Sequence, residues 1–309
     1  MWRVFLFLGT KVKYTKPHLT YEQQADQLLK RGLIADRSEL IQKLIQVSYY
    51  RLSGYWFPYR NYPEDTFKPD ARFSEIWTRY ASNRRLRFQL LDGIERIEVF
   101  LRSRLVYEFT QRYGAFGYLD PKNFPGISSS NHRILIDKIQ KEADRSSEKF
   151  IEHFGSKYSD SHQLPPLWMV VELFSFGTTL TFLRGVHFAV RRPIANDLSL
   201  DPSVLISWIR SLNGIRNTCA HHGRIWNRQF GDKPLIPKKN PDWKNPIQIR
   251  NDRIFGILTI IQYCLNRIAS QSKWENRFKE LLYSFPSIPI KQMGMPPNWE
   301  ECPIWKRGR

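Results

Sequence analysis

An arginine, an asparagine and two histidines are gathered in residues 216–222, which read RNTCAHH. A guanidinium group can hold a phosphate through paired hydrogen bonds, an amide can orient it, and an imidazole exchanges protons near neutral pH. These residue types suit cleavage of a phosphodiester bond, with Arg216 and Asn217 on the phosphate and His221 or His222 moving protons. The alternative is a structural role, because basic side chains at the carboxyl end of a helix compensate the helix dipole.

The segment closes a predicted helix that begins with Asp201 as N-cap and Pro202 at its first position. At about 100° per residue, the apolar and polar side chains of this helix separate onto opposite faces. The expected apolar face consists of Leu205, Trp208, Leu212, Ile215 and Cys219. Arg216 then lies at the flank of this face and His221 on the polar side. The two could converge if the helix unwinds near Ala220, or if the Arg216 side chain reaches round the helix. A second subunit whose motif completes the cleft is the other route, which predicts a homodimer.

The chain is strongly basic: lysine and arginine number 48 against 29 aspartate and glutamate among 309 residues, a formal net charge of +19. Such a surplus indicates a polyanionic partner, either nucleic acid or an anionic membrane face. Cys219, Cys264 and Cys302 have no metal-ligand spacing, which favours a reducing, cytoplasmic compartment and no structural zinc. The apolar segment Trp2–Leu8 is too short to span a bilayer and is expected to be a short strand or an upstream extension.

Apolar residues recur at spacings of three and four, which predicts helices, and no run of alternating residues predicts a strand. The expected helices are Thr20–Arg31, a second from Asp36 or Ser38 to about Ser48, Ser74–Arg112 as one or two helices, His132–Phe154, Leu167–Phe182, one ended by Arg191, Arg192 and Pro193, one from Asp201 into residues 216–222, Asp252–Ile268 and Trp274–Leu282. The predicted fold class is all-α, with a helical N-terminal region (1–72), a helical core (73–284) and an extended, basic, Pro-rich tail (285–309).

Two further sets of residues could contact RNA. Residues 49–60 (YYRLSGYWFPYR) interleave aromatic rings with arginine and could stack nucleobases. We favour the alternative, in which the rings anchor the core and Gly54 marks a kink or turn. The second set consists of arginines that could contact the RNA backbone. The alternative for each of them is a place on the solvated surface of a helix or loop. They are Arg84, Arg85, Arg96, Arg102, Arg224 and Arg228.

Other chemistries find weaker support in the sequence. It contains no dinucleotide fingerprint, phosphate-binding P-loop, nucleophile elbow or HExxH pair, so we expect no cofactor. Glu95 and Glu98 are the closest pair of carboxylates for a magnesium-dependent nuclease, but they alternate with Arg96 as on a charged helix surface, and we expect no metal. A DNA-binding regulator is disfavoured because no recognition helix is followed by a dimer zipper.

Several stretches together resemble a known family. They are KP at 16–17 with LLKRGL at 28–33, YYRLSGY at 49–55, LDGIERIE at 91–98, RNTCAHHGRIWNR at 216–228, and MGMPPNW at 293–299 with PIW at 303–305. The chain resembles the Abi-like family of bacterial abortive-infection proteins (AbiD/AbiF type) within the HEPN superfamily. The resemblance covers about residues 15–305 and implies an all-helical fold with a HEPN-type core.

The resemblance also implies an activity. The superfamily motif is arginine, four to six residues, then histidine; Arg216 and His221 enclose four residues and Arg216 and His222 enclose five. Similar enzymes are usually metal-independent endoribonucleases whose site forms when two HEPN units meet, leaving a 2′,3′-cyclic phosphate. The family implies anti-phage defence, with a structured noncoding RNA restraining some relatives. The alternative is a non-catalytic RNA-binding assembly protein in which the Arg–His motif is structural.

Overall fold

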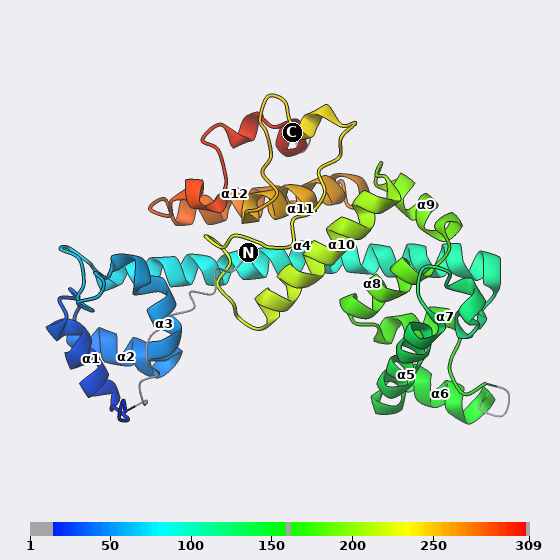
Figure 1. Ribbon diagram of the computed structural model, residues 1–309, viewed down its shortest axis with the longest axis horizontal. Helices are drawn as coiled ribbons and strands as arrows, with labels where there is room; N and C mark the ends of the chain where they lie inside the picture. The colour runs from blue at the N-terminus through cyan, green and yellow to red at the C-terminus, as the bar shows by residue number, and fades with distance from the viewer. Residues whose placement is uncertain (1–14, 159–161, 307–309) are drawn as a thin grey trace. The chain divides into compact units, whose positions relative to one another are not determined.

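The computed structural model describes residues 15–158 and 162–306. Every regular element in these residues is an α-helix or a short 3-10 helix, and the β-structure in them is limited to two isolated bridges (Figure 1). The predicted all-α class is confirmed. The segment Trp2–Leu8 lies outside the described residues, so its predicted role is not addressed.

The chain divides into two compact units, the first made of residues 1–87 and 279–288, and the second of residues 88–278 and 289–309. Two of the three divisions fall within helices, namely α4 (Phe73–Tyr113) and α12 (Trp274–Ser284), and the third follows Ile288, outside any helix. The domain limits expected after residues 72 and 284 remain predictions. All four residues of the RNTCAHH segment that could do chemistry lie in the second unit.

The first unit begins with three helices, of which the first two were predicted with nearly correct ends and the third was not predicted. They are α1 (Tyr21–Lys30), α2 (Arg37–Val47) and α3 (Tyr49–Trp56), followed by η1 (Phe57–Tyr59). Thr20 caps α1 through a capping box with Gln23, and Gly32 ends the helix with a φ of +94°. Asp36 rather than Ser38 caps α2, since its carboxylate accepts the amide hydrogen of Glu39.

The aromatic segment at residues 49–60 is helical for most of its length. Gly54 lies inside α3, so the predicted kink or turn there is wrong. Tyr55 and Trp56 are buried and anchor the core of this unit, whereas Tyr50 and Phe57 are exposed. The rings therefore divide between the core and the surface, because a helix turns successive side chains to different sides.

The second unit contains the remaining helices. They are the C-terminal part of α4, η2 (Gly117–Leu119), η3 (Pro121–Asn123), α5 (Ser129–Arg145), α6 (Lys149–Tyr158), α7 (Leu167–Val170), η4 (Val171–Leu173), α8 (Phe176–Gly185), α9 (Phe188–Asp197), α10 (Pro202–Ala220), η5 (Pro241–Trp243), α11 (Ile254–Ile268), the N-terminal part of α12, η6 (Ile290–Met293), η7 (Trp299–Glu301) and α13 (Pro303–Lys306). α4 is one continuous helix of 41 residues across both units.

Three predicted helices differ from the structure. The expected helix over 132–154 is two helices, because Ser146 adopts an extended conformation after α5. The expected helix over 167–182 breaks at Phe174, which is extended, and restarts with Ser175 as the N-cap of α8. Pro193 does not end a helix but lies inside α9, where the fully buried Val190 and Ile194 hold the helix to the core.

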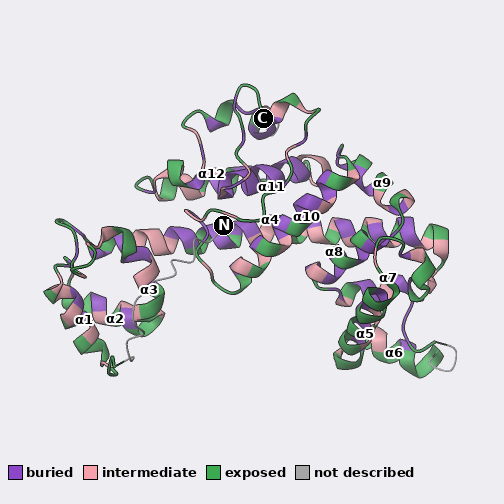
Figure 2. Cartoon of the chain, viewed as in Figure 1, coloured by how far each residue is buried: buried purple, intermediate pink, exposed green. Residues whose placement is uncertain are grey.

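Aromatic packing holds the second unit together. The rings of Trp208, Trp243 and Tyr263 lie 5.2–5.5 Å apart, which joins α10, η5 and α11. α11 is buried from Ile254 to Leu265 (Figure 2). The segment after residue 288 folds into short helices rather than a purely extended tail, and its Trp299 and Trp305 are buried, with ring centroids 5.0 Å apart.

Candidate functional site

The helix that carries the RNTCAHH segment is α10, and it forms as predicted. Asp201 is its N-cap and Pro202 its first residue. All five residues of the expected apolar face are at most 3% exposed: Leu205, Trp208, Leu212, Ile215 and Cys219. The loop after the helix is tied back to it, since the Trp208 Nε1 donates to the Leu235 carbonyl over 2.7 Å. The position of the segment is therefore set by a fully packed helix.

The carboxyl end of α10 is a regular helix terminus. His221 is the C-cap, and His222 follows with a φ of 59°, in the left-handed region usually taken by glycine. The Gly223 N–H donates to the Thr218 carbonyl over 2.8 Å, and the His222 N–H donates to the Cys219 carbonyl over 3.0 Å. This pair of bonds is the Schellman motif, which satisfies the last carbonyls of the helix.

Because α10 remains helical through Ala220, the helix does not unwind to bring Arg216 and His221 together. Five residues of helix rotate one side chain relative to the other by about 140°. Within one subunit, Arg216 and His221 thus point to different sides. Of the three routes to convergence inferred from the sequence, unwinding near Ala220 is ruled out, while a reach of the Arg216 side chain around the helix and pairing with a second subunit stay predictions.

Three side chains of the segment lack a hydrogen-bond or ion-pair partner in the described part of the chain. Arg216 is half-buried, and Asn217 and His221 are exposed. None of the three makes a side-chain hydrogen bond or an ion pair within residues 15–158 and 162–306. A guanidinium group that is partly removed from water without a carboxylate partner is suited to receive an anion from outside the chain.

Glu98 of α4 is a residue of this site that sequence reasoning did not select. Its side chain is only 13% exposed and pairs with Arg102, with the Glu98 Oε1 2.5 Å from the Arg102 Nη2. Burial raises the pKa of the Glu98 carboxyl, while the positive charges of Arg102 and Arg216 act in the opposite direction. The expected surface pattern of Glu95 and Glu98 holds only for Glu95, which is exposed.

Contacts that link α4, α8 and α10 explain why the charge of Arg216 acts on the pKa of Glu98. The Arg102 Nη2 donates to the Phe174 carbonyl, just before α8 begins. Gly177, in the first turn of α8, lies against the Asn213 side chain of α10. Asn213 is three residues before Arg216, and residues at that spacing are neighbours on a helix surface. The Coulomb interaction between Glu98 and Arg216 follows from this packing.

The other candidate RNA-binding arginines lie in different settings. Arg84 and Arg85 belong to the first unit, where Arg85 lies 5.3 Å from the ring centroid of Phe285. Arg96 is 3.5 Å from Asp92 and also donates to Ser272, so part of its hydrogen-bonding capacity is used.

Two of the candidate arginines follow α10 directly. Arg224 is exposed and Arg228 is half-buried, and both lie in the loop beyond the Schellman motif. The structure therefore keeps this pair beside the RNTCAHH segment.

The described residues contain no group of three or more histidine, cysteine or acidic side chains that could hold a metal ion. No helix in the described part of the chain is both long and apolar enough to cross a bilayer.

The sequence profile of Abi-like proteins matches residues 42–227, which is more than half of the chain and includes Glu98, Arg102, Arg216 and His221. This chain belongs to the Abi-like protein family. Neither a curated protein nor a solved structure matches it significantly. Membership of the Abi-like family supports a role in abortive infection, and the matched region spans the candidate site from α4 to the end of α10.

Proposed function

We propose that this Abi-like protein is a metal-independent endoribonuclease of an anti-phage abortive-infection system. The observation that carries the proposal is the end of α10, where Arg216, Asn217 and His221 have no side-chain partner among the described residues. The net charge of +19 supports RNA as the ligand. A structured noncoding RNA that occupies the same surface would restrain the enzyme until infection.

The proposed reaction is an internal transfer at phosphorus. A neutral imidazole, that of His221, removes the proton of a ribose 2′-hydroxyl, and the 2′-oxygen attacks the adjacent phosphorus. The bond to the 5′-oxygen breaks, and an imidazolium returns a proton to that leaving oxygen. Arg216 stabilises the negative charge of the five-coordinate intermediate, and Asn217 orients it. The products are a 2′,3′-cyclic phosphate and a 5′-hydroxyl, and DNA is inert because it has no 2′-hydroxyl.

The proposed active form is a homodimer. One copy of α10 directs Arg216 and His221 to different sides, so a single subunit offers an incomplete site. Two copies facing each other would supply a base, an acid and two phosphate-binding guanidinium groups in one cleft. A subunit that stays monomeric while fully active would contradict this part of the proposal.

The experiment that tests the proposed function is cleavage of labelled single-stranded RNA by the parent protein and by His221→Ala. We expect the variant to lose activity by at least about 100-fold, the usual contribution of a general acid or base, while keeping its fold and RNA binding. His222→Gly is the matched control, because glycine is favoured at this left-handed position. If His222→Gly loses activity and His221→Ala does not, His222 is the proton-transfer residue.

One observation favours the alternative of a non-catalytic RNA-binding assembly protein. His221 and His222 occupy the C-cap and the residue after it in a regular Schellman motif, which is a structural reason for their presence. Under this alternative the parent protein binds RNA without cleaving it, and neither His221→Ala nor His222→Gly alters the length or the ends of the RNA. Analysis of the RNA ends after incubation distinguishes the two functions.

A further inference from the structure

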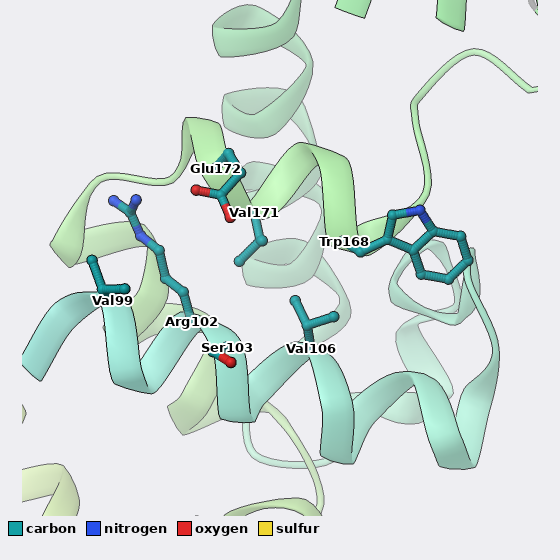
Figure 3. A pocket seen from close by; sticks show the side chains of 7 residues that line it. All are labelled: Val99, Arg102, Ser103, Val106, Trp168, Val171 and Glu172. Atoms are coloured by element: carbon teal, nitrogen blue, oxygen red, sulfur yellow. The ribbon is translucent and has the colours of Figure 1, made fainter. Parts of the chain in front are cut away.

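A groove of about 210 Å³ lies between α4 and the α7–η4 turn (Figure 3). Its lining includes Val99, Arg102, Ser103 and Val106 from α4, with Trp168 and Glu172 from the turn. Arg102 belongs to both the groove and the candidate site, because it is the ion-pair partner of Glu98. The groove therefore shares the Arg102 side chain with the surroundings of Glu98.

We propose that this groove binds one base of the single-stranded RNA substrate, with guanine preferred. The inference rests on the proposed function, since it names a feature of the RNA that the site selects. The base would stack on Trp168 and place its Watson–Crick edge at Glu172. The groove would thus set the sequence preference of cleavage, separately from the residues that act on the phosphate.

The aromatic wall is the first argument. Trp168 is 52% exposed, and it is the one exposed tryptophan in the described part of the chain. Its ring makes no aromatic contact or hydrogen bond within the described residues. Val99 is 53% exposed and lies toward the other end of the groove (Figure 3). Single-stranded RNA is commonly recognised by stacking of its bases on such exposed rings.

The polar groups are the second argument. Glu172 is exposed and has no ion pair in the residues that the structure describes. A carboxylate repels phosphate, so in a protein of charge +19 it is poorly explained by contact with an RNA backbone. A carboxylate accepts two parallel N–H bonds, and guanine offers two adjacent donors, N1–H and the N2 amine, on its Watson–Crick edge.

The floor of the groove can contribute a further contact. The Ser103 hydroxyl is exposed and makes no hydrogen bond among the described residues, so it is available to a base or a ribose. Arg102 already donates hydrogen bonds to Glu98 and to the Phe174 carbonyl. The groove therefore combines Arg102, whose guanidinium group is already hydrogen-bonded, with Glu172 and Ser103, whose polar groups have no partner among the described residues.

The test is the affinity of full-length protein for short labelled single-stranded RNAs, measured by fluorescence anisotropy in a His221→Ala background so that no RNA is cleaved. Two RNAs are compared that differ only in guanine or hypoxanthine at one position, because hypoxanthine lacks the N2 amine. We expect about tenfold tighter binding of the guanine RNA, as for other bidentate base contacts. Glu172→Gln should abolish this difference in affinity. Trp168→Ala should lower the affinity for both RNAs about tenfold.

Matched controls are Glu142→Gln and Phe188→Ala, which change an exposed carboxylate and an exposed ring elsewhere in the same unit. Equal affinity for the two RNAs in the parent, or no effect of Trp168→Ala, overturns the proposal. A shift from dimer to monomer in Trp168→Ala with unchanged RNA affinity also overturns it, since the groove would then be a contact between copies. Binding is measured without cleavage, so failure of the groove and failure of the nuclease proposal are separate outcomes.

Discussion

The carboxyl end of α10 and the second-unit part of α4 both carry arginines, yet these arginines differ in whether an acidic side chain of the same helix pairs with them. On α4, Arg96, Arg102 and Arg104 each pair with an acidic residue four positions away. On α10, Arg216 has no ion pair or hydrogen bond among the described residues. An arginine with an acidic neighbour one helical turn away is generally engaged within the helix, and Arg216 has no such neighbour.

The largest expected difference between the two regions concerns activity. Arg216→Ala should lower kcat/KM for RNA cleavage by about 10²–10³, because it removes a cation that stabilises the transition state. Arg104→Ala should leave cleavage nearly unchanged, since Arg104 is occupied by Glu108 and Asp197 at 3.0 and 2.6 Å. Steady-state kinetics of both variants measures this, and equal losses would remove the distinction between α10 and α4.

The second difference concerns stability. Arg102→Met leaves the carboxylate of Glu98 without its nearest cation in a site that is 13% exposed, and also removes the contact with the Phe174 carbonyl. We expect a loss of about 1–3 kcal/mol in the free energy of unfolding. Arg96→Met, which breaks a pair with more exposed side chains, should cost less than about 1 kcal/mol. Urea unfolding of both variants checks this order, and the reverse order would contradict it.

The third difference concerns RNA affinity. The double variant Arg224→Ala/Arg228→Ala should bind RNA more weakly. The plot of the logarithm of the RNA association constant against the logarithm of the salt concentration should become less steep by about 1.4, the value for two lost contacts to single-stranded phosphates. The double variant Arg96→Ala/Arg104→Ala is the control, because both arginines already pair with carboxylates. Titrations at several salt concentrations measure both slopes. An equal change in the control would show that RNA does not prefer the loop after α10 to the arginines of α4.

The smallest expected effect is the pH dependence of Glu98. Burial raises the pKa of this carboxyl, so the folded state favours its protonated form. The stability that this contributes is present at low pH and is lost as the pH rises through the raised pKa of the folded state. Relative to Glu98→Gln, the parent should therefore lose stability as the pH increases above 4.5, the ordinary value for the carboxyl. Urea unfolding at pH 4 and pH 7 tests this, and parallel pH profiles would contradict it.

Local sequence signals predicted some elements closely and failed at others for physical reasons. The ends of α1 and α2 were correct because capping residues act on their own neighbours. The start of α10 at Pro202 was also correct, although the Asp201 side chain makes no capping hydrogen bond. Pro193 was expected to end a helix and instead lies within α9, whose buried face contributes more than the lost hydrogen bond. The apolar run from Leu167 was expected to be one helix and is broken at Phe174, where tertiary packing overrides periodicity.

The candidate site shows the same limit. The sequence predicted the chemistry-bearing residues Arg216, Asn217, His221 and His222, and it placed them at the end of a helix, where the structure has them. It assigned Glu98 to a charged surface, because its neighbours in the chain are Arg96 and Glu95. The proximity of Glu98 to Arg216 involves residues 118 positions apart, 98 against 216, and only the packing of α4, α8 and α10 creates it.

By itself, the sequence determined the all-α class, the amphipathic α10 with its buried face, the basic charge and the Abi-like resemblance, because each depends on residue types and short spacings. Only the tertiary structure decided which arginines are paired, that α10 stays helical through Ala220, and that a groove beside Arg102 exposes Trp168. These properties depend on distances between residues far apart in the chain. Such distances arise when helices bury their apolar faces against one another, and no local pattern encodes them.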